Sequence, residues 1–165
     1  MSSEREVILI QVNSGDPSNV NGSPQSFRNI LPVPVKLDKD KEYEICAYDI
    51  QFTNRQARTP PLLSIYVNTN LTDGNTIIGS QSTNVVLWVS WTHIFTDYIP
   101  TPSLGTDVGT VYFTTEKNRK WYRLASMRQI TYVDISLTLS TGDPIPFHQT
   151  KDYTSITLAI REILK

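Results

Sequence analysis

The sequence predicts an all-β protein: a single jelly-roll β-sandwich of about eight antiparallel strands in two sheets, with long polar loops. Three observations predict this fold. Short runs of alternating apolar and polar residues recur along the 165-residue chain, as in strands buried on one face. Ten prolines, seven glycines and eight tyrosines favour strands and turns over long helices. The connections between the runs are too long for a tight up-and-down barrel.

The first two strand candidates differ in character. Val7 to Val12 is almost continuously apolar, which predicts a strand covered on both faces. Phe27 to Leu37 is extended in character but contains Pro32 and Pro34, which cannot donate ladder hydrogen bonds. This second strand is therefore expected at a sheet edge, or irregular in its middle.

Two more candidates follow before residue 70. In Glu42 to Phe52 the alternation places four side chains on one face: Cys46, Tyr48, Ile50 and Phe52. The other face is partly apolar as well, through Tyr43, Ile45 and Ala47. Leu62 to Val67 is a shorter strand whose inward side chains are expected to be Leu63, Ile65 and Val67.

The second half of the chain contains the remaining strands. Val85 to Trp91 and Val108 to Thr115 are two short candidates, and Trp121 to Met127 is expected to form one helical turn. Val133 to Ser140 alternates strictly, and alternation resumes in Tyr153 to Ile160. These last two strands are joined through a Gly-Asp-Pro turn, and each needs a partner surface to cover its apolar face.

Three polar segments are expected to be loops: Asn13 to Gln25, Asn68 to Asn84 and Phe95 to Gly109. Within the second, Ile77 and Ile78 are expected to make a brief pairing or to anchor the loop. The whole chain, 1–165, is expected to be one domain, with Met1 to Arg5 as an N-terminal arm that becomes ordered only on assembly.

Composition excludes several classes of function. A formal net charge of −1 leaves no basic excess for neutralising phosphates, so no specific nucleic-acid partner is expected. The single cysteine, Cys46, excludes an internal disulfide and is expected to be a small buried hydrophobe. The polar start does not resemble a secretory signal, and no stretch is long and apolar enough to span a membrane. The protein is therefore expected to be made inside a cell and not secreted.

The residues that could carry chemistry are scattered. His93 and His148 are far apart, and neither has Cys, Asp or Glu at metal-ligand spacing. Asp143 precedes Pro144 and is read as a turn residue, and Asp134 is expected to be exposed on a strand. No catalytic, metal-binding or cofactor-binding residue is therefore assigned, and an enzyme is not expected.

Two groups of side chains could contribute to binding. One is a basic and aromatic cluster formed by Lys117, Arg119, Lys120, Trp121, Tyr122 and Arg123. Such a cluster could stack on bases or sugars, or it could be a charged turn that leads into a buried anchor. The other group is Trp88 and Trp91, which point to opposite faces of one strand, so one is expected in the core and the other at a subunit contact.

The C-terminal third contains an ordered series of motifs: Trp121-Tyr122-Arg123-Leu124, Ile130-x-x-Val133-x-Ile135-x-Leu137, Gly142-Asp143-Pro144-Ile145-Pro146-Phe147 and Thr154 to Arg161. Together with Leu63 to Gly79 and Glu42 to Ile50, this series resembles the penton (vertex) capsid proteins of virophages and of Polinton-like and adintovirus-like DNA viruses. The similarity covers residues 27 to 163 in order. Such relatives often carry a further domain or a long insertion, whereas this chain is expected to hold a single jelly roll with its loops.

The resemblance implies a single jelly-roll capsid protein of the virion. Five copies would form a homopentamer at each fivefold vertex of an icosahedral capsid and would contact the major capsid protein. The interface residues are not assigned. Two alternatives stay open: another minor capsid protein with the same roll, and a carbohydrate-binding, lectin-like jelly roll that uses exposed Trp and Tyr.

Overall fold

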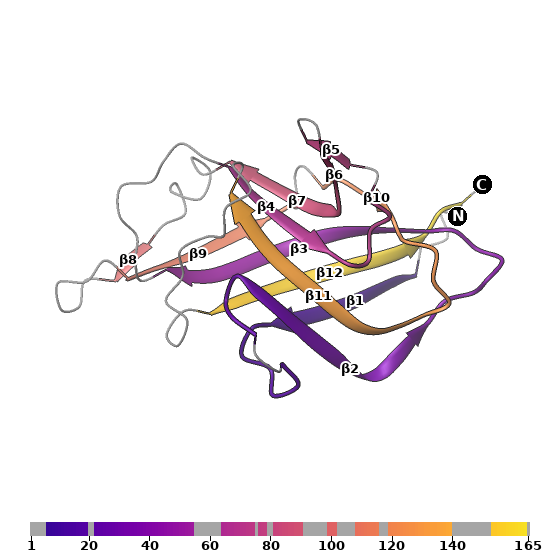
Figure 1. The fold of residues 1–165 in the computed structure, drawn as a ribbon, viewed down its shortest axis with the longest axis horizontal. Helices are drawn as coiled ribbons and strands as arrows, with labels where there is room; N and C mark the ends of the chain where they lie inside the picture. Colours follow the sequence, from indigo (N-terminus) through magenta and orange to yellow (C-terminus); the bar gives the residue numbers. More distant parts are fainter. Residues whose placement is uncertain are drawn as a thin grey trace.

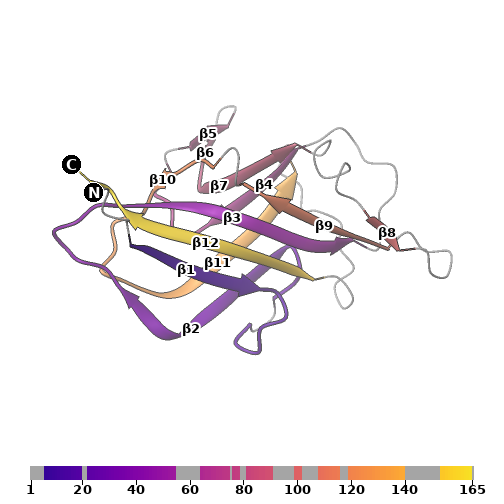
Figure 2. The same cartoon turned by 180° about the vertical axis from the view of Figure 1, so that it is seen from behind.

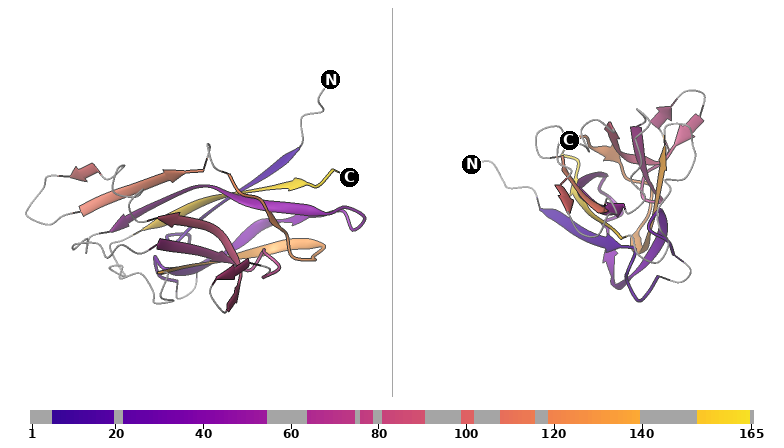
Figure 3. Two further views of the ribbon diagram at one scale, coloured as in Figure 1. Left: turned by 90° about the horizontal axis from the view of Figure 1, so that it is seen from above. Right: turned by 90° about the vertical axis from the view of Figure 1, so that its left-hand side faces the viewer.

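The computed structural model describes residues 6–19, 22–54, 64–74, 76–78, 81–90, 99–101, 108–115, 119–139 and 153–164. Within these ranges the chain forms strands, turns and bends, with no helix. Two antiparallel sheets face each other as separate layers (Figures 1 and 3). The predicted all-β sandwich is confirmed.

The larger sheet has six strands. Its order is β1 (Val7–Asn13), β12 (Thr154–Glu162), β3 (Tyr43–Asn54), β9 (Val108–Thr114) and β8 (Ile99–Thr101), and β10 (Tyr122–Arg123) pairs with β3 off this path. Figure 2 shows β1, β12, β3 and β9 side by side. All of the pairings are antiparallel.

The smaller sheet has four strands in the order β2 (Ser26–Lys36), β11 (Gln129–Leu139), β4 (Ser64–Thr69) and β7 (Val85–Ser90). A separate hairpin joins β5 (Thr76–Ile78) to β6 (Gln81–Thr83). This hairpin is the brief pairing expected at Ile77 and Ile78.

The strand order defines a jelly roll. When the eight main strands are counted along the chain, the first, eighth, third and sixth form one sheet, and the second, seventh, fourth and fifth form the other. The two C-terminal strands, β11 and β12, therefore lie in opposite sheets. Their apolar faces both point into the core between the sheets, so each strand has the partner surface that its alternating sequence predicts.

The core between the sheets is built from branched aliphatic side chains. The largest fully buried ones are Ile45, Ile50, Ile65, Leu71, Ile130, Ile135, Leu137, Ile156 and Leu158. Leu71 belongs to the segment expected to be a polar loop, yet its side chain is buried and its carbonyl accepts a 2.7 Å hydrogen bond from Ala125 N–H. That part of the expected loop is thus an anchor inside the sandwich.

The predicted first strand exists, but it is not covered on both faces. Ile10 and Val12 point into the core, whereas Leu9 on the outer face is 61% exposed. The reason is position: β1 is an edge strand of a two-layer sandwich, and no element in the described part of the chain lies over its outer face. A continuous apolar run therefore does not require two covered faces.

The two expectations for the proline-containing strand are both met. β2 is the edge strand of its sheet. Its register against β11 shifts between Ile130 and Tyr132, which pair with Val35 and Ile30. The irregular middle of β2 thus contains Pro32 and Pro34, which an edge strand and a bulge both tolerate.

The predicted face of β3 is partly wrong because the strand contains a bulge. Its register against β12 shifts at Tyr48, since Thr157 pairs with Asp49 and Leu158 with Ala47. The extra residue moves Ile45, Ala47 and Ile50 onto the core face. Cys46 lies on the other face, not beside Ile50. The side chain of Phe52 lies outside the described residues.

The helical turn expected over Trp121 to Met127 is also wrong. Tyr122 and Arg123 form a strand that pairs with Ile45 and Glu44, and Leu124 N–H donates a 2.9 Å hydrogen bond to the Tyr43 carbonyl. β9 ends its pairing with β3 at Asp49, so the first half of β3 has free edge groups. Residues 122–124 pair with Tyr43 to Ile45 along this edge, and this pairing outweighs the local preference for a helical turn.

The other expectations are met where they can be compared. Ile65 and Val67 are buried on β4, and Phe113 on β9 packs against the core. The Gly-Asp-Pro turn, Leu63, Trp91 and Met1 to Arg5 lie outside the described residues, as do the side chains of Trp88, Val89 and Val111. Part of the expected loop from Phe95 to Gly109 is the short strand β8.

Candidate interaction surfaces

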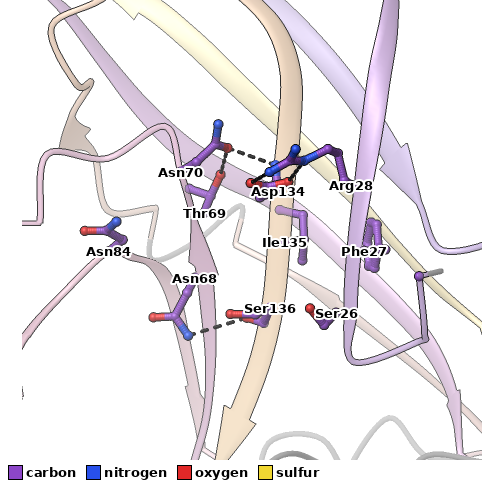
Figure 4. A pocket seen from close by; sticks show the side chains of 11 residues that line it. Ser26, Phe27, Arg28, Asn68, Thr69, Asn70, Asn84, Asp134, Ile135 and Ser136 are labelled. Carbon is purple, nitrogen blue, oxygen red and sulfur yellow. Dashed lines mark hydrogen bonds and ion pairs between the residues drawn. The ribbon is translucent and has the colours of Figure 1, made fainter. Parts of the chain in front are cut away.

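An open hollow lies on the smaller sheet, at the junction of β2, β11 and β4 (Figure 4). Its volume is about 510 Å³. It is lined by Gly22, Ser26, Phe27, Arg28, Asn68, Thr69, Asn70, Asn84, Asp134, Ile135 and Ser136. Most of the exposed lining consists of serine, asparagine and the charged pair, so the hollow presents hydrogen-bonding groups.

A charged pair marks one side of the hollow. Arg28 donates to both carboxylate oxygens of Asp134, at 2.6 and 2.8 Å, and its guanidinium lies 4.3 Å from the centre of the Tyr132 ring. The bonds to Asp134 raise the pKa of Arg28 above its usual value. Asn70 Oδ1 accepts a 2.9 Å hydrogen bond from Asp134 N–H. These contacts fix the strands' register and the orientation of polar groups, but they include no nucleophile beside a base.

Large apolar side chains are exposed on the outer faces of both sheets. On the smaller sheet they are Ile30, Val33 and Tyr132, which we call the β2 patch; Val33 is 75% exposed. On the larger sheet they are Val7 and Leu9 of β1 and Tyr112 of β9. On the larger sheet, β12 and β3 separate the β1 residues from Tyr112, so the β2 patch is the more compact of the two exposed apolar groups.

The basic and aromatic cluster is largely engaged with its own sheet. Arg119 stacks 3.6 Å from the centre of the Tyr48 ring, and Arg161 of β12 stacks 3.8 Å from the Trp121 ring. Arg123 pairs with Glu42 at 2.9 Å. These contacts favour the second interpretation, a charged turn leading into an anchor. Lys117 lies outside the described residues, and Lys120 is exposed.

Cys46 lies beneath this layer. Extending the β10–β3 register by one residue places Trp121 opposite Cys46, and the Cys46 side chain is fully buried, as expected. Burial raises the pKa of the thiol to about 11, although the nearby Arg119 and Arg161 act in the opposite direction. The thiol is therefore protonated and inaccessible in the folded protein.

We expect thiol reagents to leave Cys46 unmodified in the native state and to modify it on unfolding. Replacing Trp121 by alanine should uncover the thiol and increase its labelling rate by at least about tenfold. The measurement is mass-detected alkylation, with Tyr112→Ala as the control, since Tyr112 is an exposed aromatic residue on a different strand. Equal labelling of both variants would contradict the cover assigned to Trp121.

The remaining candidates are placed as follows. Asp134 is about one-third exposed and paired with Arg28, and Asp143, His93 and His148 lie outside the described residues. No group of three or more His, Cys, Asp or Glu within the described ranges could hold a metal ion. In the same ranges no helix has the length and hydrophobicity to cross a membrane.

Sequence reasoning missed the hollow itself. The alternation of β11 places Asp134 on the outer face, and that of β2 does the same for Arg28. What joins them is the register Arg28 to Asp134, across 106 positions of the chain. Opposite charges on the outer faces of two strands predict an ion pair only when the strands are known to be neighbours.

The geometry and strand order define the chain as a single jelly-roll protein with apolar flanks. No protein-family model matches the sequence, and no curated protein is significantly similar to it. Among solved structures, the fold is similar to that of the mavirus penton protein, with a TM-score of 0.62 and 8% identity over 96% of this chain and 100% of that one.

Weaker likenesses extend to other viral particles. Cocksfoot mottle virus gives a TM-score of 0.26 at 11% identity, covering 94% of this chain and 95% of that chain. Mud crab tombus-like virus gives 0.26 at 8% identity, covering 100% and 94%. Scores this low support no inference. The likeness to the mavirus penton protein supports the jelly-roll fold.

Proposed function

We propose that this chain is a structural capsid protein, with residues 1–165 as one jelly-roll domain that forms the penton at the fivefold vertices of an icosahedral virus. The observation that carries the proposal is the similarity of fold to a penton protein, which extends over 96% of this chain and 100% of that one. The proposal includes a place in the virion, contact with the major capsid protein and the absence of enzymatic activity.

The exposed flanks supply the physical basis for a ring. In a fivefold ring each copy presents one surface to a different surface of its neighbour, so two distinct contact surfaces are needed. The β2 patch on the smaller sheet and the exposed apolar side chains of the larger sheet lie on opposite faces of the sandwich. Burying them against a neighbour would remove apolar area from water and favour assembly.

Native mass spectrometry tests this proposal directly. The expected result is a species of five times the 18.7 kDa chain mass. The double variant Ile30→Lys with Val33→Asp should shift the protein to smaller species, because it places charges in a contact that excludes water. Both side chains are largely exposed, so circular dichroism should stay unchanged.

Ser126→Lys is the matched control, since it adds a charge at an exposed position outside the β2 patch. A wild-type protein that remains monomeric at high concentration, with or without the major capsid protein, would contradict the penton assignment. A double variant that assembles like wild type would exclude the β2 patch from the contact.

The polar hollow favours one alternative, the carbohydrate-binding jelly roll. Its asparagine, serine and Arg28–Asp134 groups could hydrogen-bond to sugar hydroxyls. Glycan-array binding by a strictly monomeric protein, lost in Asn68→Ala, would support this alternative over the penton.

A further inference from the structure

The two strands at one edge of the sandwich, β1 and β2, differ in whether their outward backbone groups have hydrogen-bond partners. β1 ends the larger sheet and β2 ends the smaller one, and the two strands lie side by side (Figure 1). An edge strand exposes a row of N–H and C=O groups to which another strand can pair. Whether each row is filled therefore determines what the edge can bind.

From Ser26 to Pro34 the outward N–H groups of the β2 edge are filled or missing. Leu137 N–H donates to the Gln25 carbonyl, so odd-numbered residues at the start of β2 face β11 and even-numbered residues face outward. The outward N–H groups are filled by side chains of the preceding loop: Ser26 N–H donates to Ser23 Oγ (3.2 Å), Arg28 N–H to Asn19 Oδ1 (3.1 Å) and Ile30 N–H to Ser18 Oγ (3.0 Å). Pro32 and Pro34 follow, and they have no N–H.

Within the described part of the chain, the β1 edge is open over most of its length. Ser14 N–H donates to the Thr154 carbonyl in the β1–β12 register, so even-numbered residues face β12 and odd-numbered residues face outward. Only Asn13 is filled: its N–H donates to Asn29 Oδ1 (2.7 Å), and its carbonyl accepts from Asn29 Nδ2 (2.9 Å). No described residue of the chain bonds the outward backbone groups of Val7, Leu9 or Gln11.

The side chains along this open edge are uncharged and mostly apolar. Val7 and Leu9 are exposed on the outer face, and Ile8 is only partly buried on the inner face. There is no charged residue from Val7 to Asn13. A strand that added here would therefore need apolar side chains on both of its faces and no charge.

We propose that the open β1 edge binds the β1 edge of a second copy of this chain, in an antiparallel pair centred on Leu9. Val7 of each copy lies opposite Gln11 of the other, and Leu9 lies opposite Leu9. Three outward-facing residue pairs each exchange two hydrogen bonds, so six bonds form in all. Pairing ends at Asn13, because Asn29 already fills its groups.

We assign a second copy to this edge because β1 is itself an uncharged strand with apolar side chains on both faces, which is what the edge requires. In this register Ile8 lies opposite Ile10 on the inner face, and no two like charges meet, since Glu6 lies opposite Val12. The contact is isologous and closes after two copies, unlike a fivefold ring. The inference therefore goes beyond the proposed function and stands independently of it.

Residue-resolved hydrogen exchange at low and high protein concentration tests the pairing. In dilute protein the amides of Val7, Leu9 and Gln11 should exchange fast, while those of Ile8, Ile10 and Val12 are protected by β12. In concentrated protein the three outward amides should exchange at least about tenfold more slowly. The amides of Arg28 and Ile30, which are already bonded, should not change with concentration.

Leu9→Lys should abolish this concentration dependence, because two like charges would meet at the centre of the pair. Ser126→Lys, which adds the same charge at an exposed position outside β1 and outside the β2 patch, should leave it intact. The proposal is overturned if the outward amides exchange at the same rate at every concentration, or if Leu9→Lys behaves as wild type. It is also overturned if protection appears only when a different capsid protein is added, because the occupant is then another chain.

Discussion

Replacing Leu158 by alanine is expected to lower the free energy of unfolding by about 2–5 kcal/mol, since it deletes a buried side chain and leaves a cavity. Leu158 is fully buried on β12, between Ile10 of β1 and Ala47 of β3. β12 is central in the larger sheet, so the cavity cannot collapse without moving two neighbouring strands. Equilibrium urea unfolding measures the change as a lower transition midpoint.

Leu9→Ala is the matched control for this substitution. Leu9 is on the neighbouring strand but 61% exposed, so the same deletion should change the free energy of unfolding by no more than about 0.5 kcal/mol in dilute protein. Equal destabilisation by the two variants would contradict the placement of the core between β12 and the smaller sheet.

Asn29→Leu is expected to destabilise the protein by about 2–4 kcal/mol. Asn29 is 3% exposed on β2, and its side-chain amide bonds both the N–H and the C=O of Asn13 on the opposite sheet. Leucine has a similar volume but no polar atom, so both backbone groups lose their partner. The readout is the urea midpoint, together with faster exchange of the Asn13 amide.

Asn68→Leu provides the control for this second substitution. Asn68 makes only 3.4 Å contacts to Ser136 and Thr138 at the open hollow, where water can replace them. Its loss should change the free energy of unfolding by about 0.5 kcal/mol or less. If Asn29→Leu is as mild as Asn68→Leu, the bridge between the sheets is not a major contribution to stability.

The sequence predicts the strands well because most of them obey the period-two rule. β11 keeps Val133, Ile135 and Leu137 inward as the alternation indicates, and the prolines of β2 correctly predict an edge. The fold class follows from these strands. Local pattern alone was sufficient wherever a strand has one buried face and no irregularity.

The errors arise where a non-local partner overrides the local pattern. One extra residue at Tyr48 inverts the faces of β3, and no composition signal marks that bulge. Tyr122 and Arg123 become a strand because half of β3 lacks an edge partner, which is visible only in the folded chain. The pairing of Arg28 with Asp134 depends on register in the same way.

Asn29 is a structurally important residue that the sequence analysis did not single out. The alternation of Phe27, Asn29 and Leu31 places this amide on the inner face of β2, where an unpaired polar group is unfavourable. That pattern is itself a signal that the amide has a buried partner. The partner's identity, Asn13 on β1, requires the two edge strands to lie together.

Because β1 pairs with β12, the larger sheet cannot be completed during synthesis until β12 has been made. The first strand along the chain finds its sheet partner in the last, and β2 likewise waits for β11. Contacts this distant in sequence place the fold among slow-folding β-topologies, on a timescale of roughly milliseconds to seconds. The apolar strand β1 leaves the ribosome before residues 154–162 exist, so it has no β12 partner until they have been synthesised.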